Sequence, residues 1–81
     1  MDHVRMDPTA LLAFETRHPY QSSAKNERIR RELGITEVRY YVLLGRAARS
    51  AEGIAAHPVT ARLVRERAAQ RAQQRERRSA A

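Results

Sequence analysis

Hydrophobic residues recur every three or four positions along most of the chain, which is the spacing of amphipathic helices. Asp7 can cap a first helix that begins at Pro8 and runs to about Arg17. The positions that share its apolar face are Ala10, Leu11, Phe14 and His18. Pro19 disfavours helix at the residue before it, so this helix should end there.

The middle of the chain predicts two helices joined by a tight turn. The first is capped by Ser22 or Ser23 and runs to Leu33, and Gly34 can then adopt the left-handed conformation that ends a helix. Thr36 is a good cap for the next helix, from Glu37 to about Arg49. Apolar side chains that would close the corner are Ile29, Leu33, Ile35, Tyr40 and Leu43, with Leu11 and Phe14 as the third side.

Two further helices follow. Ser50 can cap a short one through Ala56, and a last helix begins at Pro58 and could run to about Arg78. Its large apolar side chains, which are Val59, Leu63 and Val64, lie only in the first turns. No leucine heptad continues beyond them, so a coiled coil is not expected, and the pattern leaves open whether this helix folds back or projects.

These elements predict an all-α fold, a small helical bundle that contains a helix-turn-helix and has a long basic C-terminal helix. The expected division is a flexible N-terminus (1–6), a helix-turn-helix core (7–57), the basic helix (58–78) and a disordered end (79–81). An unrelated small bundle is the alternative, since any helical corner around a glycine gives a similar pattern.

The helix after the turn would be the recognition helix of such a motif. At 100° per residue, its buried side centres on Tyr40, and its opposite side carries Val38, Val42, Gly45 and Arg49. Arg39 and Arg46 flank one edge and Tyr41 the other. The arginines suit phosphates, whereas the two valines can touch only thymine methyl groups among base-specific contacts.

Three interpretations of this outer face remain open. The helix could lie in the major groove, where small apolar residues permit close approach. Alternatively, Val38, Tyr41 and Val42 could form an apolar patch that meets another protein or a second copy of the chain. The simplest interpretation is that Val38 and Val42 pack beneath the last helix.

Charge separates the chain into two parts. The whole chain has 16 Lys and Arg against 9 Asp and Glu, a net charge of +7. Residues 59–81 hold seven Arg and two Glu, a net charge of +5, against nine basic and seven acidic residues in 1–58, a net charge of +2. Arg67, Arg71, Arg75 and Arg78 follow one another at helical spacing and form one face of the last helix. Such a stripe suggests a polyanion as partner.

Several kinds of function are not expected. The chain has no cysteine, and its three histidines have no metal-ligand spacing, so neither a metal nor another cofactor is predicted. The sequence has no paired carboxylates and no nucleophile beside a histidine, so neither an enzyme nor a small-molecule substrate is expected. No apolar run is long enough to cross a membrane, and the last helix lacks the apolar face of a membrane-surface helix. The expected location is cytoplasmic, at the nucleoid if the protein binds DNA.

The order of several motifs resembles a family of short, uncharacterised proteins from actinobacteria and their phages. The shared motifs are Phe14-Glu15, Lys25-Asn26-Glu27, Ile29 to Ile35, Arg39-Tyr40-Tyr41-x-Leu43-Leu44, Pro58-x-x-x-x-Leu63 and the Arg-rich end. The resemblance implies a helix-turn-helix, DNA-binding protein. The family tends to have polar residues at the positions of Val38, Val42 and Gly45, and adjacent tryptophans near His18-Pro19-Tyr20.

The sequence thus predicts a small DNA-binding regulator of transcription with strong phosphate contacts. Double-stranded DNA is the expected partner, and a homodimer is possible. The residues expected to contact DNA are Lys25, Thr36, Glu37, Arg39, Arg46, Arg49, Arg67, Arg71, Arg75 and Arg78. The alternative is a protein-interaction module that docks through Val38, Tyr41 and Val42.

Overall fold

A computed structural model describes residues 7–80 of the chain, and the expected flexible segment 1–6 lies outside these residues. The described part contains no β-strand, which confirms the all-α class. Its elements are α1 (Pro8–Arg17), α2 (Ser23–Arg28), a π-helical turn η1 (Ile29–Leu33), α3 (Glu37–Ala47), α4 (Ala51–Ala56) and α5 (Pro58–Ala80).

Short polar side chains fix where four of the helices begin. Each accepts a hydrogen bond from a backbone N–H three residues later, which satisfies a donor that the first helical turn leaves unpaired. The four caps are Asp7 (2.7 Å from Ala10 N), Ser22 (3.1 Å from Lys25 N), Thr36 (3.1 Å from Arg39 N) and Ser50 (2.9 Å from Gly53 N). Asp7, Thr36 and Ser50 confirm the expected helix starts, and of the two caps expected for the second helix the structure has Ser22.

The turn between η1 and α3 depends on Gly34. Its φ of 71° is the left-handed conformation, which confirms the expected end of the helix. The π-helical form of the last turn before it was not expected. A residue pattern does not distinguish a π-helical turn from an α-helical one there, because both forms turn Ile29 and Leu33 to the same side.

Two helix ends differ from expectation. α3 ends at Ala47 and not Arg49, because the N–H groups of Arg49 and Ser50 bond to the carbonyls three residues back and the chain turns into the Ser50 cap. α5 continues through Ser79 and Ala80, which were expected to be disordered. These two residues include no glycine or proline that would end the helix.

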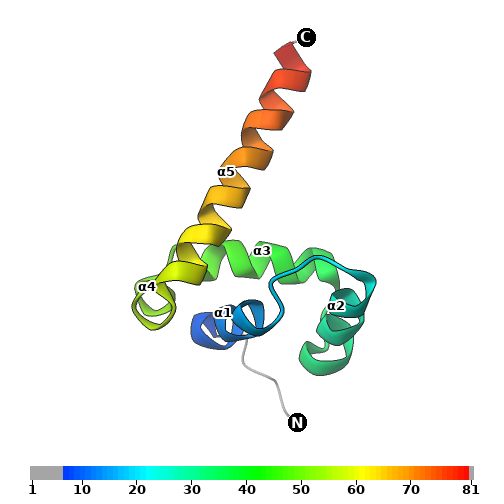
Figure 1. Cartoon of the computed structure of the whole chain (residues 1–81), viewed down its shortest axis with the longest axis vertical. Coiled ribbons are helices and arrows are strands. Elements are labelled where there is room, and N and C mark those ends of the chain that lie inside the picture. Colours follow the sequence, from blue (N-terminus) through cyan, green and yellow to red (C-terminus); the bar gives the residue numbers. More distant parts are fainter. Residues whose placement is uncertain (1–6, 81) are drawn as a thin grey trace.

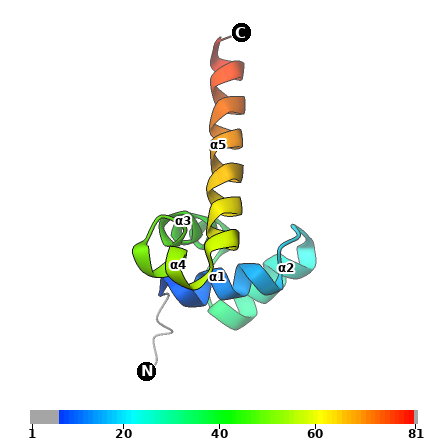
Figure 2. The same ribbon diagram turned by 60° about the vertical axis from the view of Figure 1, so that its left-hand side comes forward.

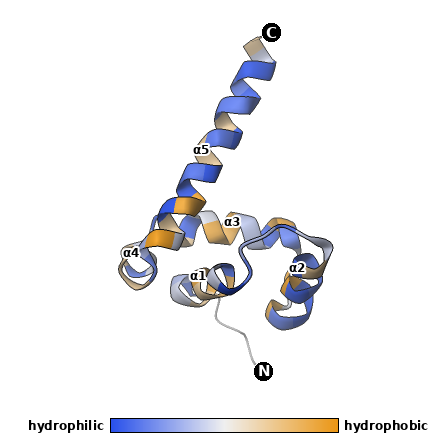
Figure 3. Cartoon of the chain, in the orientation of Figure 1, coloured by the Kyte–Doolittle hydropathy of each residue, from blue (hydrophilic) through white to orange (hydrophobic). Residues whose placement is uncertain are grey.

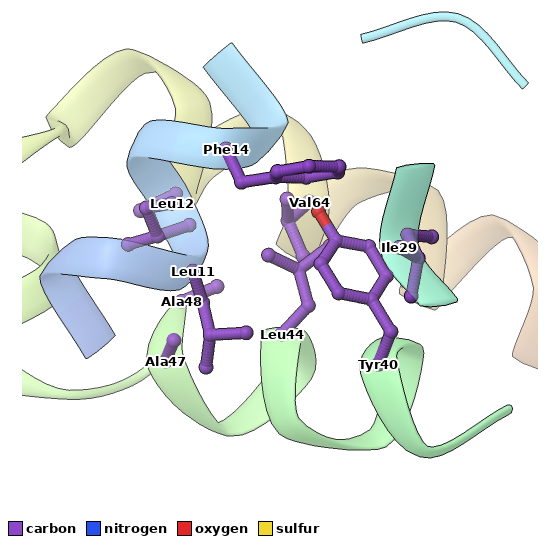
Figure 4. Packing of buried hydrophobic residues seen from close by; sticks show 10 residues of the cluster. Leu11, Leu12, Phe14, Ile29, Tyr40, Leu44, Ala47, Ala48 and Val64 are labelled. Atoms are coloured by element: carbon purple, nitrogen blue, oxygen red, sulfur yellow. The ribbon is translucent and has the colours of Figure 1, made fainter. Parts of the chain in front are cut away.

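The core lies between α1, α3 and the first turns of α5 (Figure 4). Phe14 and Tyr40 meet edge to face in it, with ring centroids 5.5 Å apart. Its buried apolar residues are Leu11, Leu12, Phe14, Ile29, Tyr40, Leu44, Ala47, Ala48, Ala61 and Val64. Leu33, Ile35 and Leu43 pack against this cluster while partly exposed, so the expected corner residues all take part.

The long helix α5 stands on the body and projects from it (Figures 1 and 2). Ala61 and Val64 at the base of α5 are buried, whereas every residue from Ala69 to Ala80 is exposed. Polar contacts add to the anchor: Arg65 Nη1 donates to the carbonyl of Ala48 at 2.7 Å, and the hydroxyls of Thr16 and Thr60 lie 2.7 Å apart. The described residues therefore measure 48 × 28 × 21 Å.

Hydropathy follows the same division (Figure 3). The base of α5 is hydrophobic and the projecting part is hydrophilic almost throughout. Two of the apolar residues at the base do not pack inward, however, because Val59 and Leu63 are 66% and 41% exposed. The helix is thus held by its small Ala61 and by Val64.

Candidate nucleic-acid interface

The way in which α3 begins and packs determines which of its side chains face the solvent. Thr36 caps the helix and Tyr40 and Leu44 are buried, so the side chains on the other side of α3 turn to solvent. That face carries Val38, Arg39, Val42 and Arg46, and Arg49 follows in the turn after α3; all five are exposed. The face worked out from the sequence is therefore the face that the fold exposes.

Val38 and Val42 do not pack beneath α5, so the simplest interpretation of these residues is wrong. Their exposed fractions are 72% and 46%. The first turns of α5 cross α3, and the rest of α5 then leaves the body. α5 therefore does not cover the N-terminal turns of α3 (Figure 1).

Instead, α3 and α5 border a groove of about 240 Å³. Tyr41, Val42 and Gly45 line it from α3, Arg49 lines it from the turn after α3, and Val64, Arg67, Ala68 and Arg71 line it from α5. A shallower depression continues from it past Val42 to Val38, Glu37 and Gln21, again with Arg71 on its rim. We call these two together the basic groove.

The Arg stripe of α5, defined as Arg67, Arg71, Arg75 and Arg78, extends from this groove. At 100° per residue, the four lie within about 80° of one another and on the side of Val64, which packs on the body. The acidic residues Glu66 and Glu76 lie on other sides of α5. The stripe therefore faces the same side of the molecule as the groove, with Arg75 and Arg78 beyond the body.

Arg67 has a role inside the protein as well. Its Nη1 lies 3.4 Å from Oε2 of Glu15, which is only 3% exposed, and its own side chain is 46% exposed. Oε1 of Glu15 accepts from Lys25 Nζ at 2.8 Å and from the Tyr40 hydroxyl at 2.6 Å. This Glu15 cluster (Glu15, Lys25, Tyr40 and Arg67) joins α1, α2, α3 and α5.

The expectation that Lys25 contacts DNA is wrong. Lys25 is 3% exposed, and its ammonium pairs with Glu15 and lies 5.8 and 5.4 Å from the ring centroids of Tyr40 and Tyr41. A buried carboxylate needs a charged partner. Lys25 therefore supports the core and does not reach a phosphate.

The Tyr40 hydroxyl stays protonated in this setting. Burial first, then its hydrogen bond to Glu15 and the negative charge of that carboxylate, raise the pKa of Tyr40 far above its usual value. The neutral hydroxyl can thus act as a permanent donor to the carboxylate.

Tyr41 lines both depressions of the basic groove. Tyr41 is half-buried, and its ring meets the Tyr40 ring edge to face with the ring centroids 4.9 Å apart. Its hydroxyl donates a hydrogen bond to Oε1 of Gln21. The three residues expected to form an apolar surface, Val38, Tyr41 and Val42, therefore line one depression, in which the Tyr41 hydroxyl is bonded to Gln21.

The family of the chain follows from a match over nearly its whole length. Residues 4–78 match a family described as protein of unknown function (DUF3263). The chain belongs to the DUF3263 family. No curated protein and no solved structure matches it.

The DUF3263 match includes every element that builds the basic groove. It spans α1 to α4 and α5 as far as Arg78, so the Glu15 cluster and the whole Arg stripe lie inside it. The long basic helix is therefore part of the family's domain and not an addition to it.

Two features are absent from the described residues of this DUF3263 chain. Across residues 7–80, three or more side chains of the kinds that bind metal gather nowhere. The helices in the same range include none with the length and apolarity needed to cross a membrane.

Sequence reasoning missed Glu15 and Gln21 as positioning residues. A signal for the first existed, because Glu15 is four residues after Leu11 and Lys25 is four before Ile29. Each charge thus lies on the apolar face of its helix, and two opposite charges on apolar faces can pair in the core. For Gln21 there was none, since it lies in the turn between α1 and α2.

Proposed function

We propose that this DUF3263 protein is a helix-turn-helix DNA-binding protein, in which α2 and η1 form the first helix of the motif and α3 is the recognition helix. The observation that carries the proposal is the basic groove. It brings Arg49, just after α3, and Arg67 and Arg71 of α5 to one surface, although they lie up to 22 positions apart in the sequence.

The charges of this surface favour a polyanion. Of the acidic side chains that line it, Glu15 is buried and paired with Lys25 and Arg67, and Glu37 is half-buried at the start of α3. The exposed arginines therefore determine the sign of the surface. Arginine pairs with phosphate oxygens through two parallel hydrogen bonds, which suits it to a nucleic-acid backbone.

The two helices have different tasks in this account. Residues at the N-terminus of a recognition helix contact base edges, and here these are Thr36, Glu37 and Val38. Arg39, Arg46 and Arg49 flank them toward the phosphates, and the Arg stripe continues along the backbone. Since phosphate contacts position a protein without reading bases, binding should have a large sequence-independent part.

A regulator of transcription is the role that we infer for such a protein, with a dimer on two half-sites as its expected state. The exposed Val38 and Val42 favour a second candidate, which is docking onto another protein. The excess of arginine around the two valines makes DNA the stronger candidate.

The experiment is fluorescence anisotropy of a labelled mixed-sequence duplex titrated with the full chain over a salt series. The proposal expects log K to fall linearly with log[salt], with a slope of about −0.9 for each phosphate contacted. Absence of binding at about 50 mM salt, where such contacts are strong, contradicts it. A pull-down that captures a protein through Val38 and Val42 would then support the second candidate.

A further inference from the structure

The two exposed valines of α3 form a small apolar surface where a recognition helix reads bases. Val38 is the second residue of α3, is 72% exposed, and Val42 follows one turn later at 46%. At 1.5 Å per residue they are about 6 Å apart along the helix. Among residues 7–80, the other large exposed hydrophobic residues are Tyr20, Ile54, Val59 and Leu63, which all lie outside α3.

Their surroundings identify the chemistry of the occupant. Arg39 and Arg46 lie on one edge of the pair, and Arg71 lines the same depression as the valines on the other, where the one acidic residue, Glu37, is half-buried. An apolar pair between cations fits a partner that is anionic at its edges and apolar at its centre. The major groove has this character where thymine presents its C5-methyl group between two phosphate backbones.

We propose that Val38 and Val42 recognise thymine methyl groups in the major groove, so that the protein prefers duplexes with thymines about two base-pair steps apart. This inference rests on the proposed function. The spacing follows from the two lengths, because about 6 Å along α3 spans nearly two steps of about 3.4 Å along the duplex. A change of the valines to polar residues should remove the preference and leave the phosphate contacts.

The test compares two hairpin duplexes that differ only in the methyl groups. One alternates deoxyadenosine and thymidine, so thymines recur every second step on each strand, and the other has deoxyuridine in place of every thymidine. Anisotropy titrations of the full chain should show binding to the deoxyuridine duplex weaker by about fourfold for each methyl group contacted.

Two variants serve as test and control. The double variant V38S/V42S should bind the two duplexes equally, within about twofold, while V59S should keep the wild-type difference. Val59 is a matched control because it is also exposed, at 66%, but lies on α5. Serine and valine have similar helix propensities, so circular dichroism should show all three chains equally helical.

The outcomes are distinct. A thymidine preference that V38S/V42S loses supports the inference. Equal binding of both duplexes by the wild-type chain overturns it, while the proposed function stands if that binding weakens with salt. Binding to neither duplex overturns both. A dimer that V38S/V42S abolishes, measured by sedimentation together with an unchanged thymidine preference, assigns the valines to self-association and also overturns the inference.

Discussion

The hydroxyl of Tyr40 donates a 2.6 Å hydrogen bond to the carboxylate of Glu15, 25 positions earlier in the chain. Both side chains are almost fully buried. Tyr40 lies on the side of α3 opposite Val38 and Val42, so this bond fixes the rotation of α3 about its own axis. The outer face of the helix is thus oriented from inside the core.

Removal of this hydroxyl should destabilise the fold without altering the outer face. Y40F leaves a buried carboxylate with one donor fewer, which costs about 1–3 kcal/mol of unfolding free energy. Y41F, whose hydroxyl bonds to exposed Gln21, should change it by about 0.5 kcal/mol or less. Urea denaturation followed by circular dichroism measures both, and equal losses would contradict the role assigned to Tyr40.

Tyr40 should also make stability depend on pH at the alkaline end. Burial and the neighbouring Glu15 raise the pKa of Tyr40 above the ordinary 10.0, so the folded state keeps a proton that the unfolded state loses. The stabilisation is complete below pH 10 and is lost as the pH rises further, by about 1.4 kcal/mol per unit. Denaturation at several pH values should show this slope in wild type and its loss in Y40F. The same slope in both would exclude Tyr40 as its source.

Lys25 should matter for folding and not for DNA. K25M removes one partner of a buried ion pair and should cost about 3–5 kcal/mol. The double variant E15Q/K25M should recover part of this loss, since no carboxylate is then left without its ammonium. Thermal denaturation gives the order of the three chains.

The DNA measurement on the recovered variant separates the two roles of Lys25. The salt slope of E15Q/K25M should equal that of wild type, because a buried ammonium contacts no phosphate. A reduction of about 0.9 in the magnitude of the slope would show instead that Lys25 contacts a phosphate.

Two glycines should respond to alanine in opposite directions. Gly34 has a φ of 71°, where a side chain is strained even though no atom lies within 4 Å of the added Cβ. G34A should therefore cost about 1–2 kcal/mol from the backbone alone. Gly45 lies in α3, where alanine is the better helix former, so G45A should gain up to about 1 kcal/mol. The denaturation midpoints of the two variants measure both changes. A midpoint of G34A equal to that of wild type would contradict the left-handed turn assigned to Gly34.

Local signals explain why much of this fold could be predicted. Asp7, Ser22, Thr36 and Ser50 each cap a helix by bonding three residues ahead, and Gly34 ends one through its own backbone. Such interactions are confined to a few neighbouring residues, so they can be recognised in the sequence. The outer face of α3 follows in the same way from the positions of Tyr40 and Leu44.

The interactions that assemble the site are long-range and could not be predicted in this way. Arg67 and Glu15 are 52 positions apart, and Lys25 was expected on the surface because lysine is rarely buried without a partner. The direction of α5 also depends on distant contacts, since the carbonyl of Ala48 accepts a hydrogen bond from Arg65, which lies 17 positions later in the chain. Only the packed structure shows that Arg67 and Arg71 of the Arg stripe border one groove with α3.

The side of α5 that borders the groove should bind phosphate, and a pair of charge-matched variants tests this expectation. R71Q/R75Q and R62Q/R77Q each remove two positive charges, but the first pair lies on the Arg stripe and the second on the opposite side of α5. Glutamine keeps the helix propensity, so both chains should fold.

The deciding measurement is the salt dependence of duplex binding by anisotropy for the two variants and wild type. R71Q/R75Q should lower the magnitude of the slope by about 1.8, which is about 0.9 for each phosphate that the variant no longer neutralises, and R62Q/R77Q should leave the slope unchanged. Equal slopes for the two variants would show that only the net charge of α5 matters and would contradict the interface described above.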